Sequence, residues 1–123
     1  MIQRLYIPHK LPGFNEMLGA SNRNRHVYNK LKKQVEWWIS VEILDQGVKP
    51  IKSAFFRFTW HEKLGRGRPR DPDNICAGKK FVLDALQATG ILDDDGRHKN
   101  VGWFEEVFYG DTQGVEIEIH SRP

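Results

Sequence analysis

The sequence predicts a single α+β domain, in which one small mixed β-sheet is covered by two helices. The chain has 123 residues, which is the length of one domain, so residues 1–123 form one unit. Apolar residues alternate in four short segments and recur every three or four residues in two longer ones. The segments follow in the order strand, helix, strand, helix, strand, strand. This order does not tell which strands are neighbours in the sheet.

The N-terminal part begins with a strand and a long helix. Residues 3–7 alternate apolar and polar side chains, and Pro8 ends this strand. Residues 11–24 are rich in Pro, Gly, Ser and Asn, which favours a loop. Residues 27–46 have helical periodicity with a lysine-rich polar face, and Gly47 ends the helix.

An aromatic strand and a basic loop occupy the middle of the chain. Residues 53–60 alternate, so that Phe56, Phe58 and Trp60 share one face of the strand. The segment 61–70, HEKLGRGRPR, combines cations with Gly and Pro and is typical of a loop.

A second helix and two strands complete the chain. Residues 74–88 have a buried apolar side, and Gly90 ends the helix. An acidic turn follows at residues 93–96. Residues 101–109 and 115–120 then predict two strands joined as a hairpin.

Composition and charge exclude several classes of protein. The single cysteine excludes an intrachain disulfide and a cysteine-rich zinc site. No apolar run approaches the length of a membrane span, so we expect a cytoplasmic protein without a membrane partner. The net charge is +3, but cations dominate residues 20–33 and 63–80 whereas acids dominate after residue 93. This polarity indicates a basic surface for a polyanion beside a group of carboxylates.

Two acidic segments flank the second helix. Asp71 and Asp73 surround Pro72, and in an extended backbone both carboxylates would point to the same side. The helix would then return the chain to these residues at the acidic turn 93–95. Converging carboxylates repel one another unless a cation neutralises them, and oxygen ligands favour Mg²⁺ or Mn²⁺ over Zn²⁺. With cations nearby, this pattern fits metal-assisted phosphodiester hydrolysis, although spacing alone is equally compatible with solvated loops.

Residues 70–95, RDPDNICAGKKFVLDALQATGILDDD, resemble the central motif of the RusA family of Holliday-junction resolvases, particularly its phage and prophage members. Residues 11–33, LPGFNEMLGASNRNRHVYNKLKK, are similar to the opening of that family, so the resemblance covers most of the chain. The residues that match the central motif are Asp71, Asp73, Asn74, Lys80, Asp84, Ala85, Leu86, Gly90, Asp94 and Asp95.

The chain departs from the family pattern at one place. In the shorter family version the lysine follows the second Asp of Asp-x-Asp by four residues, whereas this chain has three additional residues. Both Lys79 and Lys80 therefore stay open as the family lysine, and the preserved spacing to Asp84 favours Lys80. Gly78 is expected to mark a kink or a delayed helix start. The Lys80–Asp84 spacing also favours a helix-stabilising pair.

The resemblance implies an enzyme: a Mg²⁺-dependent, structure-specific DNA endonuclease, in which Mn²⁺ can substitute. It would resolve four-way junctions by paired symmetric nicks in DNA recombination and repair. The implied metal ligands are Asp71, Asp73 and Asp95, with Asp94 as a weaker candidate, and Lys80 would contact the scissile phosphate. The family also implies a homodimer in the cytoplasm of a bacterium or phage-infected cell, with branched DNA as partner and no small-molecule cofactor.

Further cations are candidates for contacts with DNA phosphates. They are Lys32, Lys33, Arg66, Arg68, Arg70 and Lys79. For those of the long helix, a solvated helix face is an equal alternative. Two other functions stay open: a branched-DNA-binding module without catalysis, and a small phosphatase-like metal hydrolase, against which the basic polarity argues.

Overall fold

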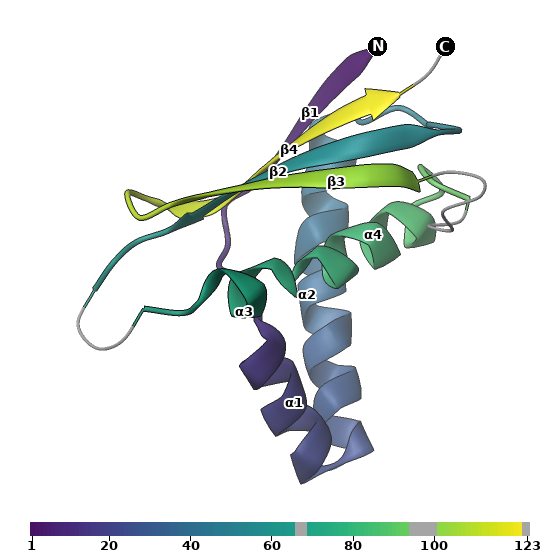
Figure 1. Cartoon of the computed structure of the whole chain (residues 1–123). Helices are drawn as coiled ribbons and strands as arrows, with labels where there is room; N and C mark the ends of the chain where they lie inside the picture. Colours follow the sequence, from purple (N-terminus) through teal and green to yellow (C-terminus); the bar gives the residue numbers. More distant parts are fainter. Residues whose placement is uncertain (66–68, 94–100, 122–123) are drawn as a thin grey trace.

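A four-stranded mixed sheet forms the centre of the computed structural model, which describes residues 1–65, 69–93 and 101–121 (Figure 1). In spatial order, β4 is antiparallel to both β1 and β2, and β2 is parallel to β3. The mixed sheet and the α+β class are thus confirmed. The strands are β1 (Ile2–Ile7), β2 (Ala54–Glu62), β3 (Val101–Tyr109) and β4 (Gln113–Ser121).

The last two strands do not pair with each other, so the expected hairpin is wrong. β2 lies between them, and its Phe58 is opposite Ile117 of β4 on one side and Glu106 of β3 on the other. The central position of β2 is favourable because its aromatic residues at positions 56, 58 and 60 are then covered from both sides. Alternation along a strand reveals its two faces but not its neighbours.

The chain has four helices in the described ranges, more than the two expected. They are α1 (Phe14–Arg23), α2 (Arg25–Asp45), α3 (Pro72–Cys76) and α4 (Lys79–Ala88). The expected second helix is divided at Gly78, where a Cβ would lie 3.0 Å from the Cβ of Leu11. The kink at this glycine is thereby confirmed. In the parts of the chain described, no helix combines the length and apolar character needed to cross a membrane.

Helix α1 occupies a segment expected to be a loop, so that prediction is wrong. The Gly13 amide, just before the helix, donates to Glu16 Oε2 at 2.7 Å, and the Asn15 amide donates to Asn74 Oδ1 at 2.9 Å. Amides at a helix start have no partner within the helix, and these two carboxyl and amide oxygens satisfy them. One of the acceptors comes from a distant part of the sequence, which local turn signals could not indicate.

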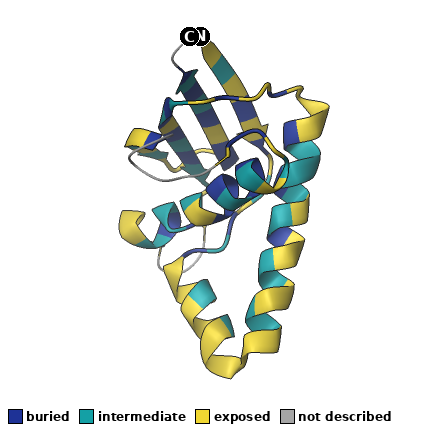
Figure 2. Cartoon of the chain, turned by 90° about the vertical axis from the view of Figure 1, so that its right-hand side faces the viewer, coloured by how far each residue is buried: buried dark blue, intermediate teal, exposed yellow. Residues whose placement is uncertain are grey.

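The core lies between one face of the sheet and helices α2 and α4, while the α1–α2 hairpin extends away from the sheet and is largely exposed (Figures 1 and 2). Fully buried side chains from all three elements interlock there. They include Phe56, Phe58, Ile117, Val35, Ile39, Ile43, Phe81, Ala85 and Leu86. Burying each large apolar side chain contributes roughly 1.5–3 kcal/mol. The opposite face of the sheet is not covered by any of these helices.

Candidate functional site

Asp71 and Asp73 stand at the start of α3. The Asp71 carbonyl accepts from the amides of Asn74 and Ile75, both at 3.0 Å, so Asp71 is the residue before the first helical turn. Pro72 begins the helix, because a proline in the first turn needs no amide donor and has a suitable φ. Asp73 therefore has helical backbone, and the expectation of an extended Asp71–Asp73 segment is wrong.

Both carboxylates are available for a ligand. Asp71 and Asp73 are exposed, and neither side chain forms a hydrogen bond or ion pair with the residues that the structure describes. Two carboxylates plus water molecules are a usual ligand set for Mg²⁺. Across residues 1–65, 69–93 and 101–121, however, no three His, Cys, Asp or Glu side chains are grouped closely enough to hold a metal ion.

After α4, the described chain up to Asp93 does not come back to the start of α3. The expected return of the chain to Asp71 and Asp73 is therefore wrong for these described residues. Leu92 forms a bridge with Ile51, just before the start of β2. Helix α3 lies near the opposite end of this strand, at Glu62 (Figure 1). Nine strand residues separate these ends by about 30 Å. Asp94 and Asp95 lie outside the described residues, and the metal-binding role of Asp95 stays a prediction.

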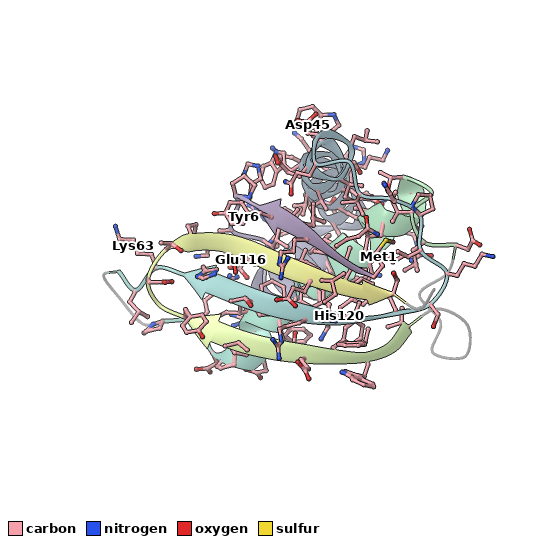
Figure 3. The ribbon with its side chains drawn as sticks, turned by 90° about the horizontal axis from the view of Figure 1, so that it is seen from above. Met1, Tyr6, Asp45, Lys63, Glu116 and His120 are labelled. Atoms are coloured by element: carbon pink, nitrogen blue, oxygen red, sulfur yellow. The ribbon has the colours of Figure 1, made fainter. Side chains whose placement is uncertain are left out.

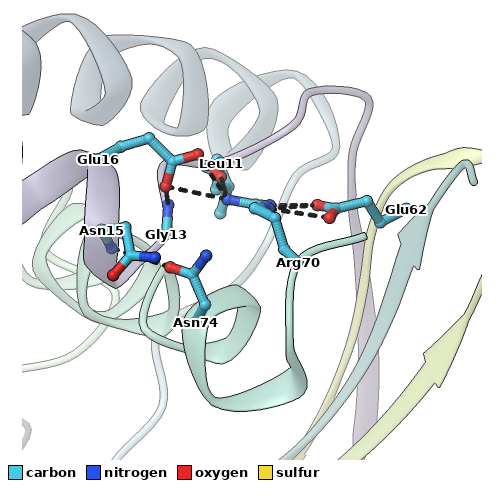
Figure 4. Close-up of polar contacts among 7 residues, drawn as sticks. All are labelled: Leu11, Gly13, Asn15, Glu16, Glu62, Arg70 and Asn74. Atoms are coloured by element: carbon cyan, nitrogen blue, oxygen red, sulfur yellow. Dashed lines mark hydrogen bonds and ion pairs between the residues drawn. The ribbon is translucent and has the colours of Figure 1, made fainter. Parts of the chain in front are cut away.

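Arg70 fastens the acidic segment to the rest of the fold (Figure 4). Its Nε donates to both carboxylate oxygens of Glu62 at 2.9 Å, and its Nη2 pairs with the same carboxylate. Its Nη1 donates to Glu16 Oε1 at 3.1 Å and to the Leu11 carbonyl at 3.3 Å. The side chains of Arg70 and Glu62 are only 12% and 14% exposed. Arg70, expected as a DNA contact, thus has its donors engaged within the chain.

The surroundings of Arg70 keep its guanidinium charged. Burial disfavours the charge, but the hydrogen bonds and charge of Glu62, and then those of Glu16, outweigh it and hold the pKa of Arg70 above its ordinary value. The planar guanidinium suits this arrangement because it can bind one carboxylate with two nitrogens and still reach a second.

Asn74 and Gly13 connect the same segment to α1. The Asn74 side chain accepts from the Asn15 amide at 2.9 Å. A Cβ at Gly13 would lie 2.5 Å from Asn74 Oδ1 and 2.6 Å from Arg70 Nη1, so only glycine fits there. The start of α1, the start of α3 and the Arg70 ion pairs therefore form one packed unit (Figure 4).

Lys79 points into a half-buried polar cluster. Its Nζ donates to Glu106 Oε1 at 3.0 Å and lies 4.5 Å from the centre of the Phe104 ring. The Trp60 indole donates to the same Glu106 oxygen at 3.3 Å. Burial, followed by the negative charge of Glu106, raises the pKa of the nearby Cys76 thiol. Lys79, expected to contact DNA, is thus engaged with Glu106.

Sequence reasoning missed Glu106. On β3 it lies between Phe104 and Phe108 at alternate positions, and register places all three opposite the inward-facing aromatic residues of β2. An acid on the helix-covered face of a strand is the signal that could have revealed it, because such a charge needs a partner there.

Lys80 lies on the more accessible side of α4. Its side chain is 55% exposed, and its Nζ is 3.3 Å from Asp84 Oδ2, which confirms the helix pair. Lys32 of α2 approaches the same oxygen at 3.7 Å. The structure therefore brings the candidate catalytic lysine and one candidate DNA contact to the same carboxylate. Lys33 is exposed on α2, whereas Arg66 and Arg68 lie outside the described residues.

No family model matches the chain, and no curated protein matches it either. Two features of the chain therefore indicate its function: the motif in the sequence, and the geometry of the described residues, with two unengaged carboxylates at the start of α3 and an accessible lysine in the first turn of α4.

Proposed function

We propose that this protein is a Mg²⁺-dependent endonuclease of the RusA type that nicks branched DNA. The observation that carries the proposal is the motif of residues 70–95. Its described acidic and basic members fall on two consecutive helices, with Asp71 and Asp73 at the start of α3 and Lys80 in the first turn of α4.

The residues fit the chemistry of phosphodiester hydrolysis. Asp71 and Asp73 offer hard oxygen donors that no described residue occupies, and the start of a helix tolerates their negative charge well. A bound Mg²⁺ would activate a water molecule and stabilise charge on the phosphate. The ammonium group of Lys80 would bind and position the phosphate. The side chain is accessible for this role because it stays 55% exposed in its pair with Asp84. Asp95 is implied as a third ligand by the family resemblance alone, and the position of Asp93, next to Leu92 near the start of β2, does not support it.

Exposed cations supply a surface for the DNA backbone. The α1–α2 hairpin extends away from the sheet (Figure 1), and its tip and the first turns of α2 carry basic side chains. The exposed ones are Arg23, Arg25, Lys30 and Lys33. Each phosphate contact releases counterions, so affinity for DNA should fall steeply with salt. Arg70 and Lys79 are assigned to positioning the site, because both are engaged in ion pairs within the chain.

Junction cleavage across a metal series tests the proposal. The native chain should nick a synthetic four-way junction with Mg²⁺ or Mn²⁺ and not with a chelator. Asp71→Asn and Asp73→Asn should each lower the cleavage rate by more than about 100-fold, beyond the usual effect of residues that only support a metal ligand. Junction binding should persist. Asp45→Asn, an exposed change at the far end of α2, is the matched control. Full cleavage in both site variants would refute the proposal.

The two lysines give a sharper comparison within the same assay. Lys80→Met should lower the cleavage rate of a correctly folded chain, whereas Lys79→Met should act mainly on stability by leaving Glu106 without its cation. If Lys79→Met lost more cleavage activity per folded molecule than Lys80→Met, the roles assigned to the two lysines would be reversed.

The second candidate function is a branched-DNA-binding protein without catalysis. One observation favours it: the exposed cations of the α1–α2 hairpin offer contacts to the DNA backbone that need no metal ion. This candidate predicts junction binding that is indifferent to divalent metal, with no product at any metal concentration.

A further inference from the structure

The two edges of the sheet differ in how their backbone groups are satisfied. In the strand order β1, β4, β2, β3, the edge strands are β1 and β3. The outward amides and carbonyls of an edge strand have no neighbouring strand to bond with. Figure 3 shows β1 beside the end of α2 that carries Asp45, whereas β3 forms the opposite margin of the sheet.

The β1 edge is closed by residues at and after the end of α2. The Gln46 side chain accepts from the Tyr6 amide at 2.9 Å and donates to the Tyr6 carbonyl at 2.7 Å, as a neighbouring strand would. The Gln3 side chain accepts from the Lys49 amide at 2.7 Å and donates to the Lys49 carbonyl at 3.1 Å. These bonds hold the chain after α2 along β1, in the place that a further strand would take.

The β3 edge has no such cover within residues 1–65, 69–93 and 101–121. Among these residues, the backbone of β3 forms hydrogen bonds with β2 alone. Alternate residues of a strand direct their amide and carbonyl to the same side, so half of these groups point away from β2. The register irregularity lies before Phe104, which leaves residues 104–109 as a regular edge. The strand also contains no lysine or proline, the residues that often protect an edge.

Exposed apolar side chains gather along the same edge. Four of the nine residues of β3 are large apolar residues that are at least 36% exposed, namely Trp103, Phe104, Val107 and Tyr109. Because neighbours along a strand alternate in direction, these side chains project to both faces of the sheet. An extended chain laid beside β3 would cover part of each of them while it satisfies the outward backbone groups.

We infer that the edge of β3 binds an extended segment of another protein, rich in basic and apolar residues, which adds to the sheet as a further strand. In this mode of recognition, backbone bonds supply affinity and the alternating side chains supply specificity. The charge of Glu105 selects the basic residue. Its side chain is 44% exposed and pairs with Arg57 of β2 at 2.9 Å. A lysine or arginine opposite Glu105 in the added strand would extend this row to plus, minus, plus.

The acids in the middle of β3 disfavour two other occupants. Antiparallel pairing of two copies of β3, centred on Glu105 or Glu106, would place like charges directly opposite one another, which is destabilising. A nucleic acid binds through cations that contact its phosphates. The nearby cation Lys79 is already held by Glu106 at 3.0 Å, so this edge suits a basic peptide better than a polyanion.

A synthetic peptide of seven residues that alternates lysine and valine is the probe, with a fluorescent label for anisotropy. The native chain should bind it at least about tenfold more tightly than a peptide that alternates glutamate and valine, a difference of about 1.4 kcal/mol. Glu105→Lys should reverse this preference. Asp45→Lys, the same change of charge at an exposed residue of α2, is the matched control and should leave the preference unchanged.

Methylated peptides distinguish strand addition from attraction between charges alone, and they need no variant of the chain. Methylation of alternate peptide amides removes either the donors that face β3 or those that face solvent. Because each hydrogen bond contributes about 0.5–1.5 kcal/mol, loss of three donors should weaken binding by more than about tenfold. The peptide methylated at the other amides should bind almost as the unmodified peptide does.

Hydrogen exchange locates the bound peptide, and the inference it tests does not rest on the proposed nuclease activity. Saturating peptide should slow exchange at alternate amides of residues 104–109. The Tyr6 amide, already bonded to Gln46, should not change. No binding of the lysine–valine peptide, protection at another element, equal effects of the two methylated peptides, or an unchanged preference in folded Glu105→Lys would each overturn the inference. Protection of the β3 amides in the free chain that rises with chain concentration would assign the edge to a second copy, and would also overturn it.

Discussion

Replacing Arg70 with methionine should destabilise the fold, although arginine in a basic loop would ordinarily be regarded as a surface residue. The change removes every hydrogen bond of the guanidinium and leaves Glu62, 14% exposed, without its cation. Breaking a buried ion pair on one side costs about 3–5 kcal/mol. Glu16 is 45% exposed and adds little. Because neither buried partner is completely shielded, we expect the free energy of unfolding to fall by about 2–4 kcal/mol.

Urea unfolding followed by tryptophan fluorescence measures this loss. Lys80→Met is the matched control, because it removes an exposed helix pair worth only about 0.3–0.5 kcal/mol. Arg70→Lys should lie between the native chain and Arg70→Met, since lysine keeps the charge but cannot bind two carboxylates in the same way. A stability of Arg70→Met within about 0.5 kcal/mol of the native value would refute the structural role.

DNA binding separates this role from the one expected from sequence. If Arg70 contacts a phosphate, its removal should lower the slope of log affinity against log salt by about 0.9 without changing stability. We expect the slope to be unchanged for the folded variant.

Two further substitutions and one pH dependence extend these tests. Gly13→Ala should lower the free energy of unfolding by about 1–3 kcal/mol, because its Cβ would lie 2.5 Å from an amide oxygen. Gly19→Ala, which has open space around it in α1, should instead stabilise the fold by about 0.5–1 kcal/mol. Thermal unfolding measures both, and equal effects would contradict the close packing at Gly13. Phe58→Ala, in the fully buried row of β2, should cost about 3–5 kcal/mol in the same measurement, and a loss below 1 kcal/mol would place Phe58 outside the core. The hydrogen bond to Asp111 raises the pKa of His61 above its ordinary value of 6.5. The pair of protonated His61 with Asp111 therefore contributes its full stabilisation below pH 6.5, and this stabilisation is lost as the pH rises through the raised pKa. His61→Gln should remove this loss from plots of unfolding temperature against pH, and an unchanged plot would exclude the His61 pair as its source.

Local patterns in the sequence were sufficient for most elements. Alternation in β1 and β2, with Phe56, Phe58 and Trp60 on the inner face, depends only on the two-residue period of a strand. The long helix α2 likewise follows from helical periodicity, and the division of the second helix at Gly78 was expected from the three additional residues of the motif. The acidic pair of Asp71 and Asp73 was visible as a motif, and neither carboxylate forms a hydrogen bond or ion pair with a described residue.

Other features depend on residues that are distant in sequence. Helix α1 begins where Asn74 supplies an acceptor, and β3 lies beside β2 because a crossover through α3 and α4 can join parallel strands. Arg70 and Lys79 are cations in the sequence, but only tertiary contacts decide that Glu62 and Glu106 engage them. Periodicity reports which face of an element is buried; it carries no information about which element, or which opposite charge, will cover that face.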